Sequence, residues 1–344
     1  MSNKEETQQQ PIPVTLITGF LGSGKTTLLN RILSGPDSNR FAVIQNEFGE
    51  ISIDHELVVK EEEGIFEMQN GCLCCTVRDD LIRILESLRE RKQDFDRILI
   101  ETTGLADPVP VAQTFFSSIH IQKDFRLDGI ITLVDALHIE TQLIEAPEAR
   151  QQIICADLII LNKTDLANIE QKAGARKSIE EFNQEAPVKE TTLAKTDINE
   201  LFNISLLHPD RLDDIEASLD FSGDEDNHDH EHHHEHSHDH SHSHDSEVSS
   251  FSLELDGTMD LERLDAWLNM LPILHGGLLY RMKGILNLEN EERTFVFQAV
   301  FSVLQGSFGR PWKTDEKRRN RFVFIGKNLN RQLLDEGFRA CLSQ

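Results

Sequence analysis

The chain lacks any apolar run approaching the ~20 residues that a membrane-spanning helix needs. It also lacks the basic start and apolar core of a secretory signal, because Ser2 to Gln10 is polar and the apolar run Val14 to Thr18 is short. Basic residues are scarce as well: 34 Lys and Arg face 60 Asp and Glu, giving a formal net charge of -26. Such a charge disfavours nucleic acid as a partner. We therefore expect a cytoplasmic protein with neither a membrane nor a nucleic-acid partner.

Cysteine is also rare, and its placement does not resemble a disulfide framework. Of the five cysteines, Cys72, Cys74 and Cys75 are crowded into four residues, whereas Cys155 and Cys341 are isolated. A crowded group of thiols in an intracellular protein indicates metal or redox chemistry. The two isolated cysteines are expected to be small apolar residues within packed elements.

Strand and helix patterns alternate between residues 13 and 208. Short apolar strands separated by helices predict an α/β fold with a parallel sheet flanked by helices. The glycine-rich turn after the first of these strands makes this the expected sheet of a P-loop NTPase. The expected strands are Val14–Thr18, Phe41–Ile44, Arg97–Ile100, Gly129–Val134 and Asp157–Leu161, and the expected helices are Lys25–Leu33 and Leu81–Arg91.

The rest of the chain divides into three further segments. Residues 1–12 are expected to be a disordered N-terminus and residues 209–250 a flexible linker rich in His and Asp. Residues 251–344 are expected to form a smaller α+β domain. Its predicted strands are Phe251–Leu255, Leu278–Leu286, Thr294–Phe297 and Arg321–Ile325, and its predicted helices are Asp260–Asn269 and Asn330–Leu342.

A glycine-rich turn between the first strand and the first helix predicts a nucleotide site. It fits the phosphate-binding pattern G-x-x-x-x-G-K-[ST], in which backbone N–H groups and the helix N-terminus surround the phosphates. Lys25 would reach the β- and γ-phosphates, and the Thr26 hydroxyl would coordinate Mg²⁺. The candidate nucleotide-binding residues of this turn are Gly19, Gly22, Ser23, Gly24, Lys25, Thr26 and Thr27.

Two further motifs follow predicted strands, where parallel sheets bind ligands. In Glu101-Thr-Thr-Gly104, the acid would help to hold Mg²⁺ and the glycine N–H would meet the γ-phosphate, although a plain strand-end turn is the alternative. In Asn162-Lys163-Thr-Asp165, the carboxylate would accept from both guanine donors, which favours GTP over ATP. No general base is evident, so we expect slow intrinsic turnover.

The crowded thiols Cys72, Cys74 and Cys75 predict a zinc site with three protein ligands and one open position. Glu50 is the candidate fourth ligand, and His120 is a weaker one. A buried trio of small residues and a redox pair are the alternatives.

Ten histidines lie within the seventeen residues from 228 to 244, interleaved with Asp, Glu and Ser. Imidazole binds zinc, nickel and cobalt, so this tract predicts low-affinity metal collection. A merely solvated spacer is the alternative. The histidines are His228, His230, His232, His233, His234, His236, His238, His240, His242 and His244.

Together these motifs resemble the CobW family of P-loop GTPases, which contains metal chaperones, and they lie nearest its YjiA-like branch. The glycine-rich turn, Asn46-Glu-Phe-Gly-Glu50, Asn70-Gly-Cys-Leu-Cys-Cys75, the Glu101 motif and the Asn162 motif occur in family order. The C-terminal segments that resemble the family are Leu279-Tyr-Arg-Met-Lys-Gly284, Gly309-Arg-Pro-Trp312 and Phe324-Ile-Gly326. Two positions depart from close relatives: Gln45, where a glutamate can occur, and Ser118, where a histidine can occur.

The resemblance implies a metal-responsive GTPase that uses GTP and Mg²⁺, binds Zn²⁺ at the three cysteines and delivers it to metalloenzyme clients. Metal- or nucleotide-dependent self-association is a further expectation. Nickel or cobalt delivery, including for cobalamin synthesis, and a histidine-rich metal buffer are the alternatives. In the C-terminal domain, Trp312 and Lys317 to Arg319 are either a client-binding face or ordinary surface.

Overall fold

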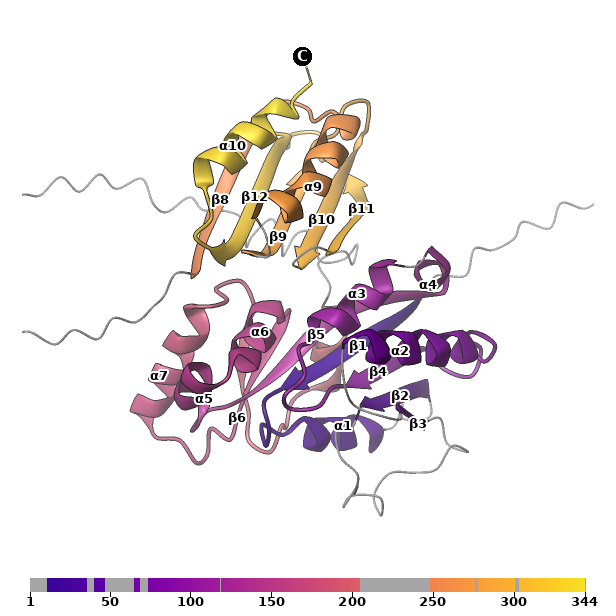
Figure 1. The fold of residues 1–344 in the computed structure, drawn as a ribbon, viewed down its shortest axis with the longest axis vertical. Coiled ribbons are helices and arrows are strands. Elements are labelled where there is room, and N and C mark those ends of the chain that lie inside the picture. Colours follow the sequence, from indigo (N-terminus) through magenta and orange to yellow (C-terminus); the bar gives the residue numbers. More distant parts are fainter. Residues whose placement is uncertain are drawn as a thin grey trace, which may run out of the picture.

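The structure is a computed structural model that describes residues 11–35, 40–46, 65–68, 74–117, 119–204, 248–275, 278–300 and 303–343. These residues form two sheet-containing parts, drawn in indigo to pink and in orange to yellow in Figure 1. In the first part, strands and helices alternate along the chain, as the pattern of apolar runs predicts. Its elements are β1 (Ile12–Gly19), α1 (Lys25–Leu33), β2 (Phe41–Asn46), β3 (Ile65–Met68), α2 (Cys74–Arg89), β4 (Arg97–Glu101), α3 (Val109–Ser117), α4 (Ile119–Asp124), β5 (Phe125–Asp135), α5 (Ile139–Glu145), α6 (Pro147–Cys155), β6 (Leu158–Asn162), α7 (Ile169–Glu180), β7 (Val188–Glu190) and a 3₁₀ turn (Ile198–Leu201).

The first part contains a seven-stranded parallel sheet in the order β3-β2-β4-β1-β5-β6-β7. All strands run in one direction, so the carboxyl ends of β2, β4, β1, β5 and β6 lie at a single edge. The glycine-rich turn, the Glu101 motif and the Asn162 motif all start at that edge. The sheet thus brings together three motifs that are far apart in the sequence.

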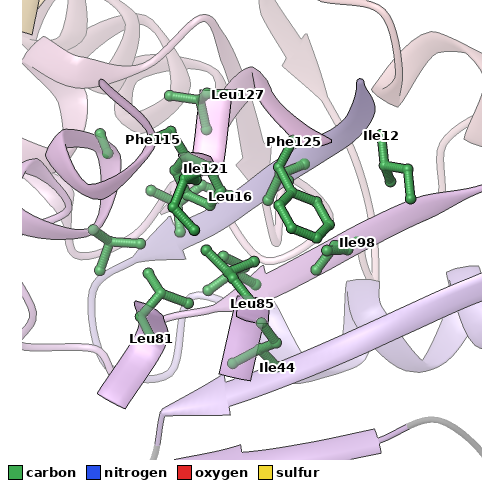
Figure 2. Close-up of a cluster of buried hydrophobic side chains, with 14 of the residues drawn as sticks. Ile12, Leu16, Ile44, Leu81, Leu85, Ile98, Phe115, Ile121, Phe125 and Leu127 are labelled. Atoms are coloured by element: carbon green, nitrogen blue, oxygen red, sulfur yellow. The ribbon is translucent and has the colours of Figure 1, made fainter. Parts of the chain in front are cut away.

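Both faces of this sheet are buried. Along β4, Ile98 and Ile100 pack into one apolar cluster, whereas Leu99 packs into another with α1. Figure 2 shows the first cluster, in which Leu81 and Leu85 of α2 and Phe115 of α3 meet the strands. Alternation between two cores explains why the strands read as continuous apolar runs in the sequence.

The second part is a five-stranded antiparallel sheet in the order β11-β10-β9-β12-β8. One face of this sheet is covered by α9 and α10, where Phe338 packs against Phe322 and Phe324 (Figure 1). The half-buried Trp267 of α9 meets Phe338 edge-on. Trp312 is buried, so the expectation that it lies on the surface is wrong. The elements are β8 (Val248–Asp256), α9 (Leu261–His275), β9 (Leu279–Leu286), β10 (Arg293–Val300), β11 (Val303–Pro311), β12 (Arg319–Lys327) and α10 (Arg331–Ala340).

The two parts meet where β11 lies against α3 and where β9 lies against the end of α6. Arg281 of β9 is almost fully buried there, and it forms an ion pair with Asp157. Its Nη1 also donates to the carbonyl oxygens of Cys155, at 2.9 Å, and Ala156, at 2.8 Å. A guanidinium at the carboxyl end of a helix is electrostatically favourable.

Every element expected from the sequence has a counterpart in the structure, but most bounds differ and helices α3 to α7 were not predicted individually. Helix α2 begins at Cys74 rather than near Leu81, so part of the thiol motif has a helical backbone. Strands β3, β7 and β11 were not predicted. Within the described residues, no helix combines the length and apolar character needed to cross a membrane.

Candidate functional site

The glycine-rich turn has the backbone geometry that its glycines allow. Gly22 and Gly24 have φ values of 72° and 109°, which side-chain-bearing residues rarely adopt. A Cβ on Gly24 would also lie 2.4 Å from Asn162 Nδ2, so the turn and the Asn162 motif touch. The turn therefore needs glycine at position 24 for both conformation and space.

Lys25 is buried within the turn and is 8% exposed. Its Nζ donates to the carbonyl oxygens of Gly19, at 2.8 Å, and Phe20, at 3.2 Å. Burial lowers the pKa of the Lys25 ammonium below its usual value, and the charge of Glu101 offsets part of that effect. The buried Oγ of Ser23 has no hydrogen-bond partner among the described residues. A buried cation and an orphaned hydroxyl in one turn fit an anionic ligand such as a nucleotide phosphate.

Thr26 and Glu101 meet beside this turn. The Thr26 hydroxyl donates to Glu101 Oε1 at 2.8 Å, and Gln45 Nε2 donates to Glu101 Oε2 at 2.9 Å. Gln45 and Glu101 are paired neighbours on β2 and β4, which explains the contact. Hydroxyl and carboxylate oxygens are the donors that Mg²⁺ binds, so the residues present fit this ion.

The loop after β4 is held against the glycine-rich turn. Thr102 Oγ1 donates to Thr18 Oγ1 at 2.9 Å, joining the ends of β4 and β1. A Cβ on Gly104 would lie 2.6 Å from the backbone nitrogen of Leu21, so no larger residue fits unchanged. The loop that contains Gly104 therefore lies directly against the glycine-rich turn.

Asn162 connects the base motif to the turn. Its Nδ2 donates to the Ser23 carbonyl at 2.9 Å, while its Oδ1 accepts from the Ala194 N–H at 2.8 Å and from Thr191 Oγ1 at 3.2 Å. Asp165, three residues later, is exposed. The buried Asn162 therefore holds the glycine-rich turn and the Thr191–Ala194 loop together.

Lys163 has a left-handed backbone, with a φ of 62°, and its Nζ bonds Asp135 Oδ2 at 2.8 Å. His138 Nδ1 lies 3.0 Å from the same oxygen, and the Leu137 N–H donates to Asp135 Oδ1. Burial raises the pKa of Asp135, but the hydrogen bonds from Lys163, His138 and Leu137 outweigh it and leave the pKa below its usual value. The charged form of Asp135 thus fixes the lysine of the base motif.

Most of the predicted metal ligands lie outside the described residues. These are Cys72, Glu50 and the histidine tract from His228 to His244. Cys74 and Cys75 begin α2, and only their backbone is described. His120 is exposed in α4, and the described part of the chain contains no group of three or more potential metal ligands.

Sequence reasoning missed several residues that organise this site. Gln45 was noted only as a departure from relatives, and Asp135, Gln152 and the Thr191–Ala194 loop were not considered. Each acts through a neighbouring strand or helix rather than through a motif of its own. A polar residue at the carboxyl end of a predicted strand was the signal available for Gln45 and Asp135.

Comparison with known proteins gives the decisive match. Residues 13–190 match the family described as CobW/HypB/UreG, nucleotide-binding domain, and residues 248–342 match the Cobalamin synthesis protein cobW C-terminal domain. The chain belongs to the CobW family of P-loop GTPases. This membership confirms the predicted family, fold class and GTPase activity of the chain.

Individual CobW relatives match along almost their whole length. Zinc chaperone YjiA of Escherichia coli is 36% identical, with 97% of this chain and 98% of the relative covered. Zinc-regulated GTPase metalloprotein activator 1 of Schizosaccharomyces pombe is 34% identical, with 93% and 84% covered. The crystal structure of Zn(II)-bound YjiA GTPase from E. coli matches with a TM-score of 0.67 at 31% identity, covering 97% of this chain and 100% of that one.

Proposed function

We propose that this CobW-family GTPase binds zinc at Cys72, Cys74 and Cys75 and couples GTP hydrolysis to the transfer of zinc to metalloprotein clients. The observation that carries the proposal is the hydrogen bond between Thr26 and Glu101 beside the buried Lys25. This hydrogen bond supports a phosphate and Mg²⁺ site at the carboxyl edge of the parallel sheet. Strand β3, the last strand before the thiol motif in the sequence, ends at the same edge.

Each residue of the nucleotide site has a distinct role in this proposal. Lys25 exchanges its two carbonyl partners for the β- and γ-phosphates, which stabilises its buried charge. Thr26 and Glu101 hold Mg²⁺, which would neutralise charge on the phosphates. The Gly104 N–H contacts the γ-phosphate, and Asp165 selects guanine.

The position of the thiol motif along the chain supports this coupling. β3 ends at Met68 and α2 begins at Cys74, so the motif follows the carboxyl edge of the sheet. β3 lies three strands from β1, a separation of about 14 Å at the usual strand spacing. A shift of the loops at this edge can therefore reach the metal-binding segment, with the fourth ligand position, for which Glu50 is the candidate, left open for exchange.

The names of the relatives support zinc as the cargo and metalloproteins as the clients. YjiA is named a zinc chaperone, and the Schizosaccharomyces pombe protein is named a zinc-regulated metalloprotein activator. We extend both properties to this chain because the similarity spans both domains. The histidine tract then serves as a collector that raises the local zinc concentration.

GTP hydrolysis by the metal-stripped protein, with and without one equivalent of zinc under reducing conditions, tests the coupling. We expect zinc to change the rate and Cys74→Ser to remove that change. Lys25→Ala should abolish hydrolysis and leave zinc binding intact. A rate indifferent to zinc in the wild type would overturn the coupling.

Delivery of nickel or cobalt is the second candidate, favoured by the ten histidines of the linker. Titration with cobalt separates the two, since thiolate-bound cobalt gives strong charge-transfer absorption. Displacement of that absorption by zinc but not by nickel would support zinc. A rate that responds to nickel or cobalt alone would favour the second candidate.

A further inference from the structure

Helix α6 holds the loop that follows β4. Gln152 of α6 is 1% exposed, and its Nε2 donates to the carbonyl oxygens of Gly104, at 3.1 Å, and Ala106, at 3.0 Å. The main-chain carbonyl of Gln152 accepts from Thr132 Oγ1 at 2.7 Å, which fixes this turn of the helix to β5. Both N–H groups of one buried amide therefore serve a loop that belongs to the nucleotide site.

The same loop has little freedom on its opposite side. Gly104 packs against Leu21 of the glycine-rich turn so closely that a Cβ would meet both the backbone nitrogen and the side chain of Leu21 at 2.6 Å. Gly104 thus lies between the phosphate-binding turn and Gln152. A change in the position of Gly104 has to be taken up by Gln152 and its helix, because packed interiors transmit displacement.

The carboxyl end of α6, one turn beyond Gln152, is held by the C-terminal domain. Arg281 of β9 donates to the carbonyls of Cys155 and Ala156 and pairs with Asp157, directly after the helix. The second oxygen of Asp157 accepts from the Ile130 N–H at 2.9 Å, so the ion pair is anchored in the sheet. Asn183 also donates to Ala156 O, at 3.0 Å, so both domains hold this terminus.

From these contacts we propose that Gln152 is a positioning residue for the loop 101–108. We further propose that α6 couples the nucleotide-dependent position of this loop to the C-terminal domain through Arg281. Gln152 and Cys155 are three residues apart in this helix, about 5 Å along its axis, so a single helical turn separates the two sets of contacts. It lies on the side of the parallel sheet that faces the C-terminal domain (Figure 1). The proposal rests on the proposed function because it takes the Gly104 N–H as a γ-phosphate contact.

Two substitutions test the contact of α6 with the loop and its contact with the C-terminal domain independently. Gln152→Leu keeps the size of the side chain and removes both hydrogen bonds to the loop. Arg281→Lys keeps the charge but loses the forked geometry that serves two carbonyls and a carboxylate. The control for Gln152→Leu is Gln151→Leu, on the preceding residue of α6. The control for Arg281→Lys is Arg293→Lys, at the start of β10, where Arg293 pairs with Glu291.

Nucleotide affinity is the first measurement, because the γ-phosphate contact predicts an effect on one nucleotide only. In the full-length protein, Gln152→Leu should weaken GTPγS binding about tenfold and leave GDP binding within about twofold, a difference of roughly 1.4 kcal/mol. Gln151→Leu should change neither. Equal loss of both nucleotides with a lowered melting temperature would mean that Gln152 is only structural, which overturns the proposal.

Hydrogen exchange of residues 101–108 and 279–286, compared between GDP and GTPγS, is the second measurement. We expect both segments to differ between nucleotides in the wild type and in Arg293→Lys. In Arg281→Lys, the loop difference should persist while the β9 difference is lost. A β9 difference that survives Arg281→Lys would overturn the coupling alone, whereas a wild-type loop that does not respond would overturn the γ-phosphate contact and the coupling with it.

Discussion

Thr26 and Glu101 lie 75 positions apart in the chain, and the hydroxyl of the first donates a 2.8 Å hydrogen bond to the carboxylate of the second. Gln45 holds the other carboxylate oxygen, so Glu101 is oriented from both sides. The contact aligns the two groups proposed to hold Mg²⁺ before the ion arrives. Such preorganisation lowers the cost of binding the ion.

Gln45→Leu should raise the Mg²⁺ concentration needed for half-maximal GTP hydrolysis about tenfold, a typical cost for losing a residue that orients a metal ligand. The effect should disappear at saturating Mg²⁺, since the ligands themselves remain. Release of a fluorescent GDP analogue, with Mg²⁺ and with a chelator, gives a readout independent of turnover. Unchanged Mg²⁺ dependence in both assays would contradict the orienting role of Gln45.

Lys25→Met should separate stability from function. Burial lowers the pKa of the Lys25 ammonium, and its hydrogen-bond partners are two carbonyl oxygens, so the buried charge costs stability. Its removal should therefore leave the free energy of unfolding unchanged or raise it by about 1 kcal/mol. Addition of GTP should then give no rise in melting temperature. Thermal unfolding with and without nucleotide measures both effects, and a large loss of stability in the free variant would show that Lys25 is needed for the fold.

Gly24→Ala and Gly22→Ala form a matched pair within the turn. Both positions have positive φ, so each substitution carries a backbone cost of roughly 1 kcal/mol. Only at Gly24 would the new Cβ meet another residue, Asn162 Nδ2, whereas nothing lies within 4 Å of a Cβ on Gly22. We expect Gly24→Ala to weaken both GDP and GTP binding by more than about tenfold relative to Gly22→Ala, as measured by calorimetric titration. Equal affinities of the two variants would argue against the contact with Asn162.

Asp135→Asn should weaken the protein in a pH-dependent way. The folded pKa of Asp135 lies below the unfolded value of about 3.9, so its stabilisation is complete above that pH and is lost as the pH falls through the folded pKa. Near pH 7 we expect the variant to lose about 1.5–3 kcal/mol, the range for hydrogen bonds to a charged group. The difference from the wild type should shrink as the pH falls below about 4.

Urea unfolding across this pH range measures the Asp135 effect. Asp165→Asn is the control, because Asp165 is exposed and its loss should barely change stability. A stability difference at Asp135 that does not vary with pH would contradict a role for its charge.

The sequence predicted the parallel sheet and the nucleotide turn because the strands and the turn each have a signal within a short segment. Each buried strand is a continuous apolar run, and the turn is a fixed spacing of glycines around Lys25. Strands β3 and β7 are only four and three residues long, too short for a periodic signal. In β11, Gly306, Gly309 and Pro311 interrupt the alternation of apolar and polar residues that would predict a strand. The strand forms because it pairs with β10.

Contacts between elements could not be predicted in this way. The bond from Gln45 to Glu101 depends on β2 lying beside β4, an order that no single segment encodes. Gln152 is one polar residue in a helix, and nothing local distinguishes it from Gln151. Only the fold places its amide against Gly104 and places Arg281 at the end of the same helix.

The position of the half-buried Trp267 and the buried Trp312 beside the antiparallel sheet has an optical consequence. These are the two tryptophans of the chain, and its single tyrosine, Tyr280, precedes Arg281 in β9. All tryptophan and tyrosine emission of the protein therefore originates in the C-terminal domain, because the GTPase domain contains neither residue. A change in emission on exchanging GDP for GTPγS would thus report, without any label, a signal that has crossed from one domain to the other.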